Sequence, residues 1–88
     1  MRFRWNGWNL DHATRHGVPP TEAGHVVAGA RRPYPEYRGD GKWLVIGPGF
    51  DGGLIQVVYL TDPDGTVYVI HARPLTDREK RRYRRRTR

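Results

Sequence analysis

A histidine and an arginine stand two positions apart at the end of the last apolar segment of the chain, as His71 and Arg73. Side chains two positions apart in a β-strand lie on the same face of the sheet. Histidine exchanges a proton near neutral pH, and arginine binds phosphate through a planar, permanently charged group. The pair therefore combines a proton-transfer group with an anion-binding group, which is the chemistry that breaks a phosphodiester bond.

Cleavage of RNA needs a base for the 2′-hydroxyl proton, cations that stabilise the charged transition state, and a proton donor for the leaving oxygen. Arginines such as Arg73 can supply the cations, and His71 can act as the base or as the proton donor. Tyr83 or Tyr59 would position a nucleotide base by stacking.

Two of these residues have a structural alternative. Arg73 can equally form a salt bridge with Glu79 or Asp77 at the end of its strand, and such a pair would explain its position without RNA. His71 can be a buried residue whose ring is bonded to the backbone. Both interpretations stay open from the sequence.

Five further cations are expected to contact RNA, namely Arg32, Lys42, Lys80, Arg81 and Arg82. Lys42 begins the first long predicted strand whereas His71 ends the third, so about 17–20 Å of strand separates the two. They do not form one compact site. The loop over residues 31–41 can fold back over the sheet, however, and bring Arg38 or Arg32 towards Arg73.

The charge of the chain favours an acidic partner. Sixteen Lys and Arg oppose nine Asp and Glu, which gives a formal net charge of +7, and arginine predominates. A small basic domain of this kind indicates binding to nucleic acid or to an acidic protein.

The 88 residues predict a single domain over residues 1–88. Residues 80–88 are expected to be its basic helix end or a solvated tail.

Several classes of protein are disfavoured by what the sequence lacks. There is no cysteine, so disulfides and thiolate metal sites are excluded. No apolar run has the length of a membrane span, and the N-terminus lacks a signal-peptide pattern, so we expect a cytoplasmic protein without membrane contact. The glycine-rich stretch GPGFDGG joins two predicted strands and is interpreted as a turn. His12 and His16 have a metal-ligand spacing but no third ligand nearby, so we expect neither metal nor cofactor.

Two helices are predicted in the first half of the chain. The first spans residues 10–16, with Asn9 as its cap and Gly17 at its end. The second spans residues 21–30, with Thr21 as its cap.

The second half of the chain is predicted to form strands and a last helix. Three strands are expected over residues 42–47, 54–61 and 66–73, and a fourth, short one over residues 2–5. In the last of the three, Val67, Val69 and His71 should share one face. Thr76 and Glu79 have the spacing of a capping box that opens a C-terminal helix. Short turns favour antiparallel pairing, so we predict an α+β fold with helices packed on an antiparallel sheet.

The order of these segments resembles a known family. Two segments are similar to the BrnT-type (DUF497) toxins, the opening RFRWNGWNLDHATRHGVPPTEAGHVV and the closing VIHARPLTDREKRRYRR. Proteins of that family begin with Phe-x-Trp and continue with a helix ending in His-Gly-Val. They close with Ala-Arg and a basic helix containing tyrosine. The chain departs from that pattern at Asn6, where the family has aspartate, and at His71, where it has serine or threonine.

The resemblance implies a RelE-like fold with a small sheet, two N-terminal helices and a C-terminal helix. It also implies a ribonuclease toxin of a bacterial type II toxin–antitoxin pair, acting on mRNA, ribosome-associated or free. By motif position, the resemblance implies that its catalytic residues are Arg38, Arg73 and Tyr83, with His71 beside them. Its partner would be a cognate antitoxin of ribbon-helix-helix type, in a toxin–antitoxin heterotetramer, or the toxin would be a homodimer. The alternative is a non-catalytic module of the same fold that binds RNA or a protein through its basic surface.

Overall fold

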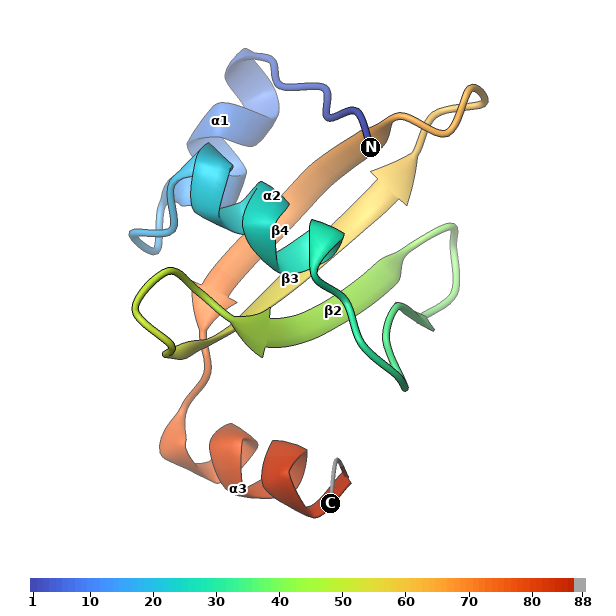
Figure 1. The fold of residues 1–88 in the computed structure, drawn as a ribbon. Helices are drawn as coiled ribbons and strands as arrows, with labels where there is room; N and C mark the ends of the chain where they lie inside the picture. The colour runs from blue at the N-terminus through green and yellow to red at the C-terminus, as the bar shows by residue number, and fades with distance from the viewer. Residues whose placement is uncertain (87–88) are drawn as a thin grey trace.

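The structure is a computed structural model, and it describes residues 1–86. These residues form three helices and one four-stranded antiparallel sheet, an α+β arrangement (Figure 1). The elements in chain order are α1 (Gly7–Thr14), α2 (Pro20–Ala28), β1 (Glu36–Tyr37), β2 (Trp43–Pro48), β3 (Leu54–Thr61), β4 (Val67–Pro74) and α3 (Asp77–Arg86). No helix among residues 1–86 is both long enough and apolar enough to span a membrane.

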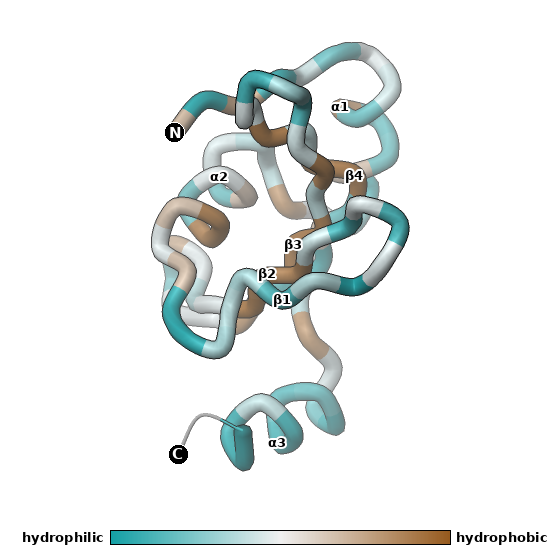
Figure 2. Tube along the Cα trace, turned by 90° about the vertical axis from the view of Figure 1, so that its right-hand side faces the viewer, coloured by the Kyte–Doolittle hydropathy of each residue, from teal (hydrophilic) through white to brown (hydrophobic). Residues whose placement is uncertain are grey.

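The strands lie in the order β1-β2-β3-β4, and each pairs with its neighbour in the chain. Burial alternates along β3, so every second residue, such as Val57 and Tyr59, faces the core. The helices α1 and α2 supply the opposing apolar groups, among them Val26 and Val27. Figure 2 shows the apolar segments of the strands and of α2 together, whereas α3 is hydrophilic throughout. The sheet therefore has an inner face that packs on α2 and an opposite, outer face, and α1 lies along β4 (Figure 1).

The fourth strand is not the one that the sequence predicts. Residues 2–5 make only one isolated bridge, Phe3 with Val67, in parallel orientation. Two backbone bonds hold it, Arg4 N to Val67 O at 2.8 Å and Val67 N to Arg2 O at 2.9 Å. The fourth strand comes instead from the loop region, where Glu36 and Tyr37 pair with β2. The N-terminal segment is too short to extend the ladder because the chain turns into α1 at Asn6.

Helix α1 begins three residues before its predicted start because Asn6, and not Asn9, is the cap. The Asn6 side chain accepts from Asn9 N at 3.2 Å, and Asn6 N donates to the Asn9 side chain at 2.7 Å. Asn9 is fully buried and also donates to Arg4 O at 3.1 Å. The asparagine pair thus forms a capping box in which the second asparagine takes the place of the usual glutamate.

The predicted cap of the second helix is also wrong. Helix α2 begins at Pro20, and no side chain caps it. Proline suits the first helical position since it lacks the amide hydrogen that would remain unpaired there. Thr21 is consequently inside the helix.

A β-bulge in β4 changes which face its last residues occupy. Tyr59 pairs with Val69 and Val58 pairs with His71, so Ile70 is an extra residue in the ladder. Val69 and Ala72 are both fully buried on the inner face. His71 and Arg73 consequently lie on the outer face, and the expectation that His71 shares a face with Val67 and Val69 is wrong. The prediction that His71 and Arg73 share a face is confirmed.

Helix α3 lies beyond the end of β4, and none of its residues is buried (Figure 1). Its start is the capping box predicted from the sequence, because Glu79 N donates to Thr76 Oγ1 at 3.2 Å and Thr76 N donates to Glu79 Oε1 at 2.9 Å. Leu75, which is 6% exposed, anchors the connection to the sheet.

Candidate functional site

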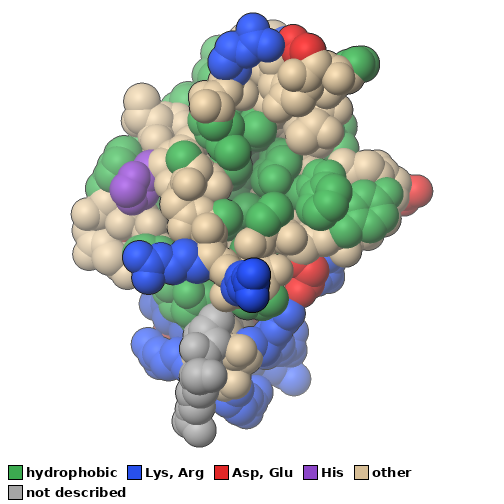
Figure 3. Space-filling model, turned by 45° about the vertical axis from the view of Figure 1, so that its right-hand side comes forward, with side chains coloured by type: hydrophobic (Ala, Val, Ile, Leu, Met, Phe, Trp, Pro, Cys, Tyr) green, Lys and Arg blue, Asp and Glu red, His purple; other side chains and the backbone are tan. Residues whose placement is uncertain are grey.

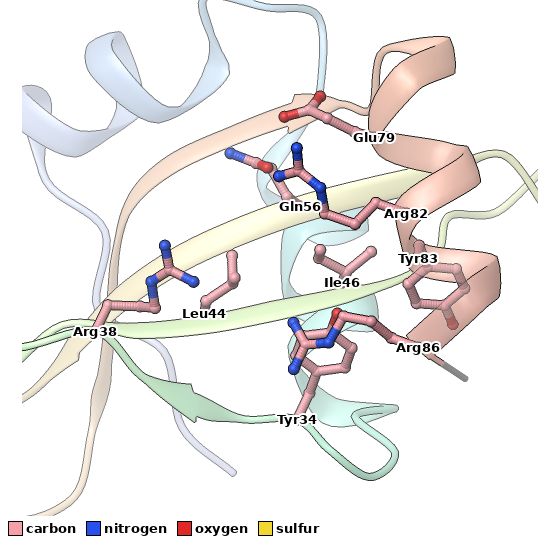
Figure 4. A pocket seen from close by; sticks show the side chains of 9 residues that line it. All are labelled: Tyr34, Arg38, Leu44, Ile46, Gln56, Glu79, Arg82, Tyr83 and Arg86. Carbon is pink, nitrogen blue, oxygen red and sulfur yellow. The ribbon is translucent and has the colours of Figure 1, made fainter. Parts of the chain in front are cut away.

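A cleft opens between α3 and the outer face of the sheet, with a volume of about 150 Å³ (Figure 4). We call it the α3 cleft. Its lining residues are Tyr34, Arg38, Leu44, Ile46, Gln56, Glu79, Arg82, Tyr83 and Arg86. Three guanidinium groups and two phenol rings thus meet over a partly apolar floor, with a single carboxylate among the lining groups.

One face of α3 forms a wall of the cleft. Glu79, Arg82, Tyr83 and Arg86 are spaced as i, i+3, i+4 and i+7, so they lie on the same side of the helix. Figure 4 shows their side chains beside the sheet. The floor comes from alternate residues of two strands, because Ile46 and Gln56 pair across β2 and β3 and face outward together. The antiparallel sheet therefore carries the site, and α3 encloses it.

The two tyrosines stack across the cleft. The ring centroids of Tyr34 and Tyr83 are 6.3 Å apart with an interplanar angle of 14°. The Arg86 guanidinium lies over the Tyr34 ring, 5.7 Å from its centroid. Tyr34 is 6% exposed, and its hydroxyl finds no hydrogen-bond partner among residues 1–86. Burial raises the pKa of Tyr34, so this ring remains neutral at physiological pH.

Two of the arginines at the cleft share one carboxylate outside it. Glu36 accepts from Arg86 Nη2 at 2.5 Å and from Arg38 Nη1 at 2.9 Å. Hydrogen bonds from Arg86 and then Arg38 hold the pKa of Glu36 below its ordinary value. This carboxylate ties the C-terminal turn of α3 to β1. Arg82 forms no ion pair with any residue in the described part of the chain, so its charge is available to a ligand.

Arg73 is engaged in the salt bridge that the sequence offered as its structural alternative. Its Nη1 and Nη2 atoms donate to Glu79 Oε1 at 2.8 Å and to Oε2 at 2.7 Å. The Arg73 hydrogen bonds, with help from the Thr76 amide, lower the pKa of Glu79 to about 2. Both side chains are 28% exposed, so the pair lies at the surface beside the α3 cleft.

His71 lies next to this pair on the outer face, and it is partly buried. Its ring meets the edge of the His16 ring at a centroid distance of 5.8 Å. Burial lowers the pKa of His71, and the nearby Arg73 and His16 charges lower it further. The imidazole is therefore neutral at pH 7 and able to accept a proton.

Apart from His71, the predicted residues divide into two groups. Arg38, Arg82 and Tyr83 line the α3 cleft, and Arg73 contacts it through Glu79. The predicted contacts that do not line it are Arg32, Lys42, Lys80 and Arg81. Lys80 faces a separate pocket and approaches Asp77 at 3.9 Å, because it lies on another side of α3. Arg32, Lys42 and Arg81 are exposed.

Three lining residues with polar groups are missing from the sequence prediction, namely Tyr34, Gln56 and Arg86. For Arg86 a signal exists, since it stands three residues after Tyr83 and four after Arg82 on one helix face. Tyr34 lies in a proline-rich loop whose path the sequence does not define.

The cations of the molecule are concentrated at this end. Helix α3 carries seven Lys and Arg residues and two carboxylates. Figure 3 shows these basic side chains gathered in the lower part of the molecule, below a face on which hydrophobic side chains predominate. No group of three His, Cys, Asp or Glu residues within residues 1–86 is arranged to hold a metal ion.

Fold and site together define a small α+β domain with a cationic, tyrosine-lined cleft. Comparison with family models, with curated proteins and with solved structures gives no match to this chain. The resemblance to BrnT-type toxins and the RelE-like assignment therefore stay predictions.

Proposed function

We propose that this protein is a metal-independent ribonuclease toxin of a bacterial type II toxin–antitoxin pair, and that it binds single-stranded RNA at the α3 cleft. The observation that carries the proposal is the composition of that cleft, in which Arg38, Arg82 and Arg86 meet the stacked rings of Tyr34 and Tyr83. Guanidinium groups bind phosphate, and aromatic rings bind unpaired bases by stacking. A cleft of this kind suits a flexible, single-stranded polyanion.

The proposed reaction uses the residues of the outer face beside the cleft. Neutral His71 accepts the 2′-hydroxyl proton, the 2′-oxygen attacks phosphorus, and the bond to the 5′-oxygen breaks. That oxygen takes a proton from water, His71 releases its proton to solvent, and a 2′,3′-cyclic phosphate remains. Arg73, with Glu79 fixing its orientation, stabilises the charge that develops on the phosphate oxygens. His71 and Val58 lie two residue pairs along β3 and β4 from Arg73 and Gln56, on the same face of the sheet, so the base and the phosphate site are neighbours.

One observation favours the second candidate, a non-catalytic RNA-binding module. Both terminal nitrogens of Arg73 are already bonded to Glu79, so a phosphate at this position must share the guanidinium with a carboxylate. In that case the cleft would bind RNA by charge and stacking alone.

A cleavage assay distinguishes the two candidates. Purified protein is incubated with end-labelled single-stranded RNA in EDTA, and binding is measured in parallel on a 2′-O-methyl oligonucleotide of the same sequence, which lacks the attacking hydroxyl. The toxin proposal expects cleavage in EDTA, and His71→Ala should reduce the rate by about 10²- to 10⁴-fold without weakening binding. Binding without cleavage would favour the second candidate. Neither binding nor cleavage would reject both.

The proposed antitoxin is tested in cells. Induced expression should arrest growth, and co-expression of the small gene next to its own should restore growth and yield a complex on purification. Size-exclusion chromatography of that complex decides between a heterotetramer and a smaller assembly. Growth arrest that Arg73→Ala leaves unchanged would contradict the role assigned to Arg73.

A further inference from the structure

Four flat groups form a column at the edge of the sheet, on β4 and α1. The Arg4 guanidinium lies 4.0 Å from the centroid of the Tyr68 ring. Tyr68 faces Trp8 at a centroid distance of 6.4 Å and an angle of 23°, and Trp8 stacks on His12 at 3.9 Å and 14°. We call Arg4, Tyr68, Trp8 and His12 the ring column.

Separate hydrogen bonds fix the orientation of three of these groups. Arg4 donates to both carboxylate oxygens of Asp62, at 2.8 and 3.0 Å. The Tyr68 hydroxyl donates to Asn6 Oδ1 at 3.0 Å. The His12 ring is bonded through Nδ1 to Trp8 O at 2.7 Å. The column is therefore held in one arrangement before any ligand arrives, which lowers the entropic cost of binding to it.

Trp8 is 52% exposed, although tryptophan is among the side chains that gain most from burial. It lies outside the hydrophobic core, to which α1 contributes Ala13. Of its two ring neighbours, Tyr68 is the more distant, with a centroid separation of 6.4 Å against 3.9 Å for His12. The exposed ring surface is accessible to another flat group.

The ring column and the α3 cleft are on the same side of the sheet. Tyr68 lies between buried Val67 and Val69, so its side chain faces outward, as does Gln56 at the floor of the cleft. Tyr68 pairs with Leu60, and Leu60 lies four positions after Gln56, which corresponds to about 13 Å of strand. His71 lies between them, opposite Val58 and against His16.

We infer that the ring column is a base-stacking site for the same RNA strand whose phosphates lie in the α3 cleft, with the strand passing over His71 between the two. The inference rests on the proposed function. Single-stranded RNA is the occupant that fits, because it presents bases and phosphates at intervals along one flexible chain. Proteins that bind single strands combine these two features, a positively charged groove and exposed aromatic rings.

The test measures binding of a 2′-O-methyl octamer that carries 2-aminopurine at each position in turn. Wild-type protein should change the fluorescence of one or two bases strongly, since a stacked 2-aminopurine is quenched. Trp8→Ala should remove that change and weaken binding between about fivefold and about 150-fold, the range for loss of one stacked base. Trp8→Phe, which keeps a ring, should restore most of the affinity.

Two controls make the result specific. Phe50 is 62% exposed and contacts His25 at a ring-centroid distance of 4.9 Å, so Phe50→Ala removes a comparable aromatic group elsewhere and should leave binding unchanged. Inorganic polyphosphate carries charge without bases, and Trp8→Ala should bind it as wild type does, which also shows that the variant is folded.

The outcomes separate the inference from the proposed function. If wild-type protein binds the octamer and Trp8→Ala binds it equally well, the inference is overturned while the proposed function stands. If Trp8→Ala loses polyphosphate binding to the same extent as octamer binding, the substitution disrupts the fold rather than a base contact, and the inference is again wrong. If wild-type protein binds neither RNA nor polyphosphate, both fail.

Discussion

Glu79 is bonded to two parts of the molecule at once. Its Oε1 atom accepts from both Arg73 and the Thr76 amide, and its Oε2 atom accepts from Arg73. A single carboxylate thus closes the first turn of α3 and fixes the guanidinium at the end of β4. Any change at this residue is expected to alter the helix and the site together.

The Glu79 pKa predicts an acid-sensitive contribution to stability. The pKa is lowered from 4.5 to about 2 in the folded protein, so the ionised pair stabilises the fold above pH 4.5 and is lost as the pH falls towards 2. Glu79→Gln cannot titrate. The urea midpoint of the wild-type protein should therefore fall further between pH 5 and pH 2.5 than that of the variant. Parallel curves for the two proteins would show that the pair contributes nothing.

Asn9 is the only polar residue among residues 1–86 whose side chain is buried in the core. Asn9→Ala would leave the Asn6 amide and the Arg4 carbonyl without their partners. We expect the free energy of unfolding to fall by about 1–3 kcal/mol, as for other buried hydrogen-bonding groups that lose a partner. Leu10→Ala, at the exposed neighbouring position, should change it by less than about 0.5 kcal/mol. Urea denaturation measures both.

At the level of elements, α3 depends on its cap and its ion pairs because it buries no residue. Thr76→Ala removes the hydroxyl that accepts from Glu79 N and should cost the helix about 1 kcal/mol. The loss should appear as faster amide exchange over residues 77–86, with little change in the β-sheet. Thr21→Ala is the matched control, since Thr21 lies in the first turn of α2 without capping it. Equal effects of the two substitutions would contradict this account.

The sequence predicts elements well where the signal is local. β3 has the predicted bounds, and the capping box of α3 is confirmed, because alternation and cap chemistry are properties of neighbouring residues. The predicted start of α1 is wrong because Asn6, three residues before Asn9, is the cap, and Asn9 completes the capping box from inside the helix. The short strand β1 has no such local signal, because pairing with β2 creates it.

The candidate site was predictable only in part, for the same reason. Arg82 and Tyr83 face the cleft as expected, and helical spacing alone would have added Arg86 and excluded Lys80. Tyr34 and Gln56 reach the cleft through the path of a loop and the register of a sheet. Neither is encoded in the spacing of residues along the chain.

For the whole molecule, the net charge of +7 makes any binding to RNA dependent on salt. Each phosphate contact to a single strand contributes about 0.7 to the slope of log affinity against log salt concentration. Arg82→Ala should therefore lower the slope by about 0.7. Arg2→Ala should not, because Arg2 is paired with Asp64 in the turn before β4, at the end of the sheet away from α3 (Figure 1). An unchanged slope for Arg82→Ala would exclude a phosphate contact there.

The extra residue in β4 also bears on how this chain tolerates changes in length. Removal of one residue from a strand ordinarily turns every following side chain to the opposite side of the sheet. Removal of Ile70 would have a different effect, because Ile70 is the extra residue of the bulge. Without it, Val69 and His71 would become neighbours and would pair with Tyr59 and Val58 in a regular ladder. A shortened chain lacking Ile70 should therefore keep its imidazole and guanidinium pointing outward, and related sequences one residue shorter at this position are compatible with the same architecture.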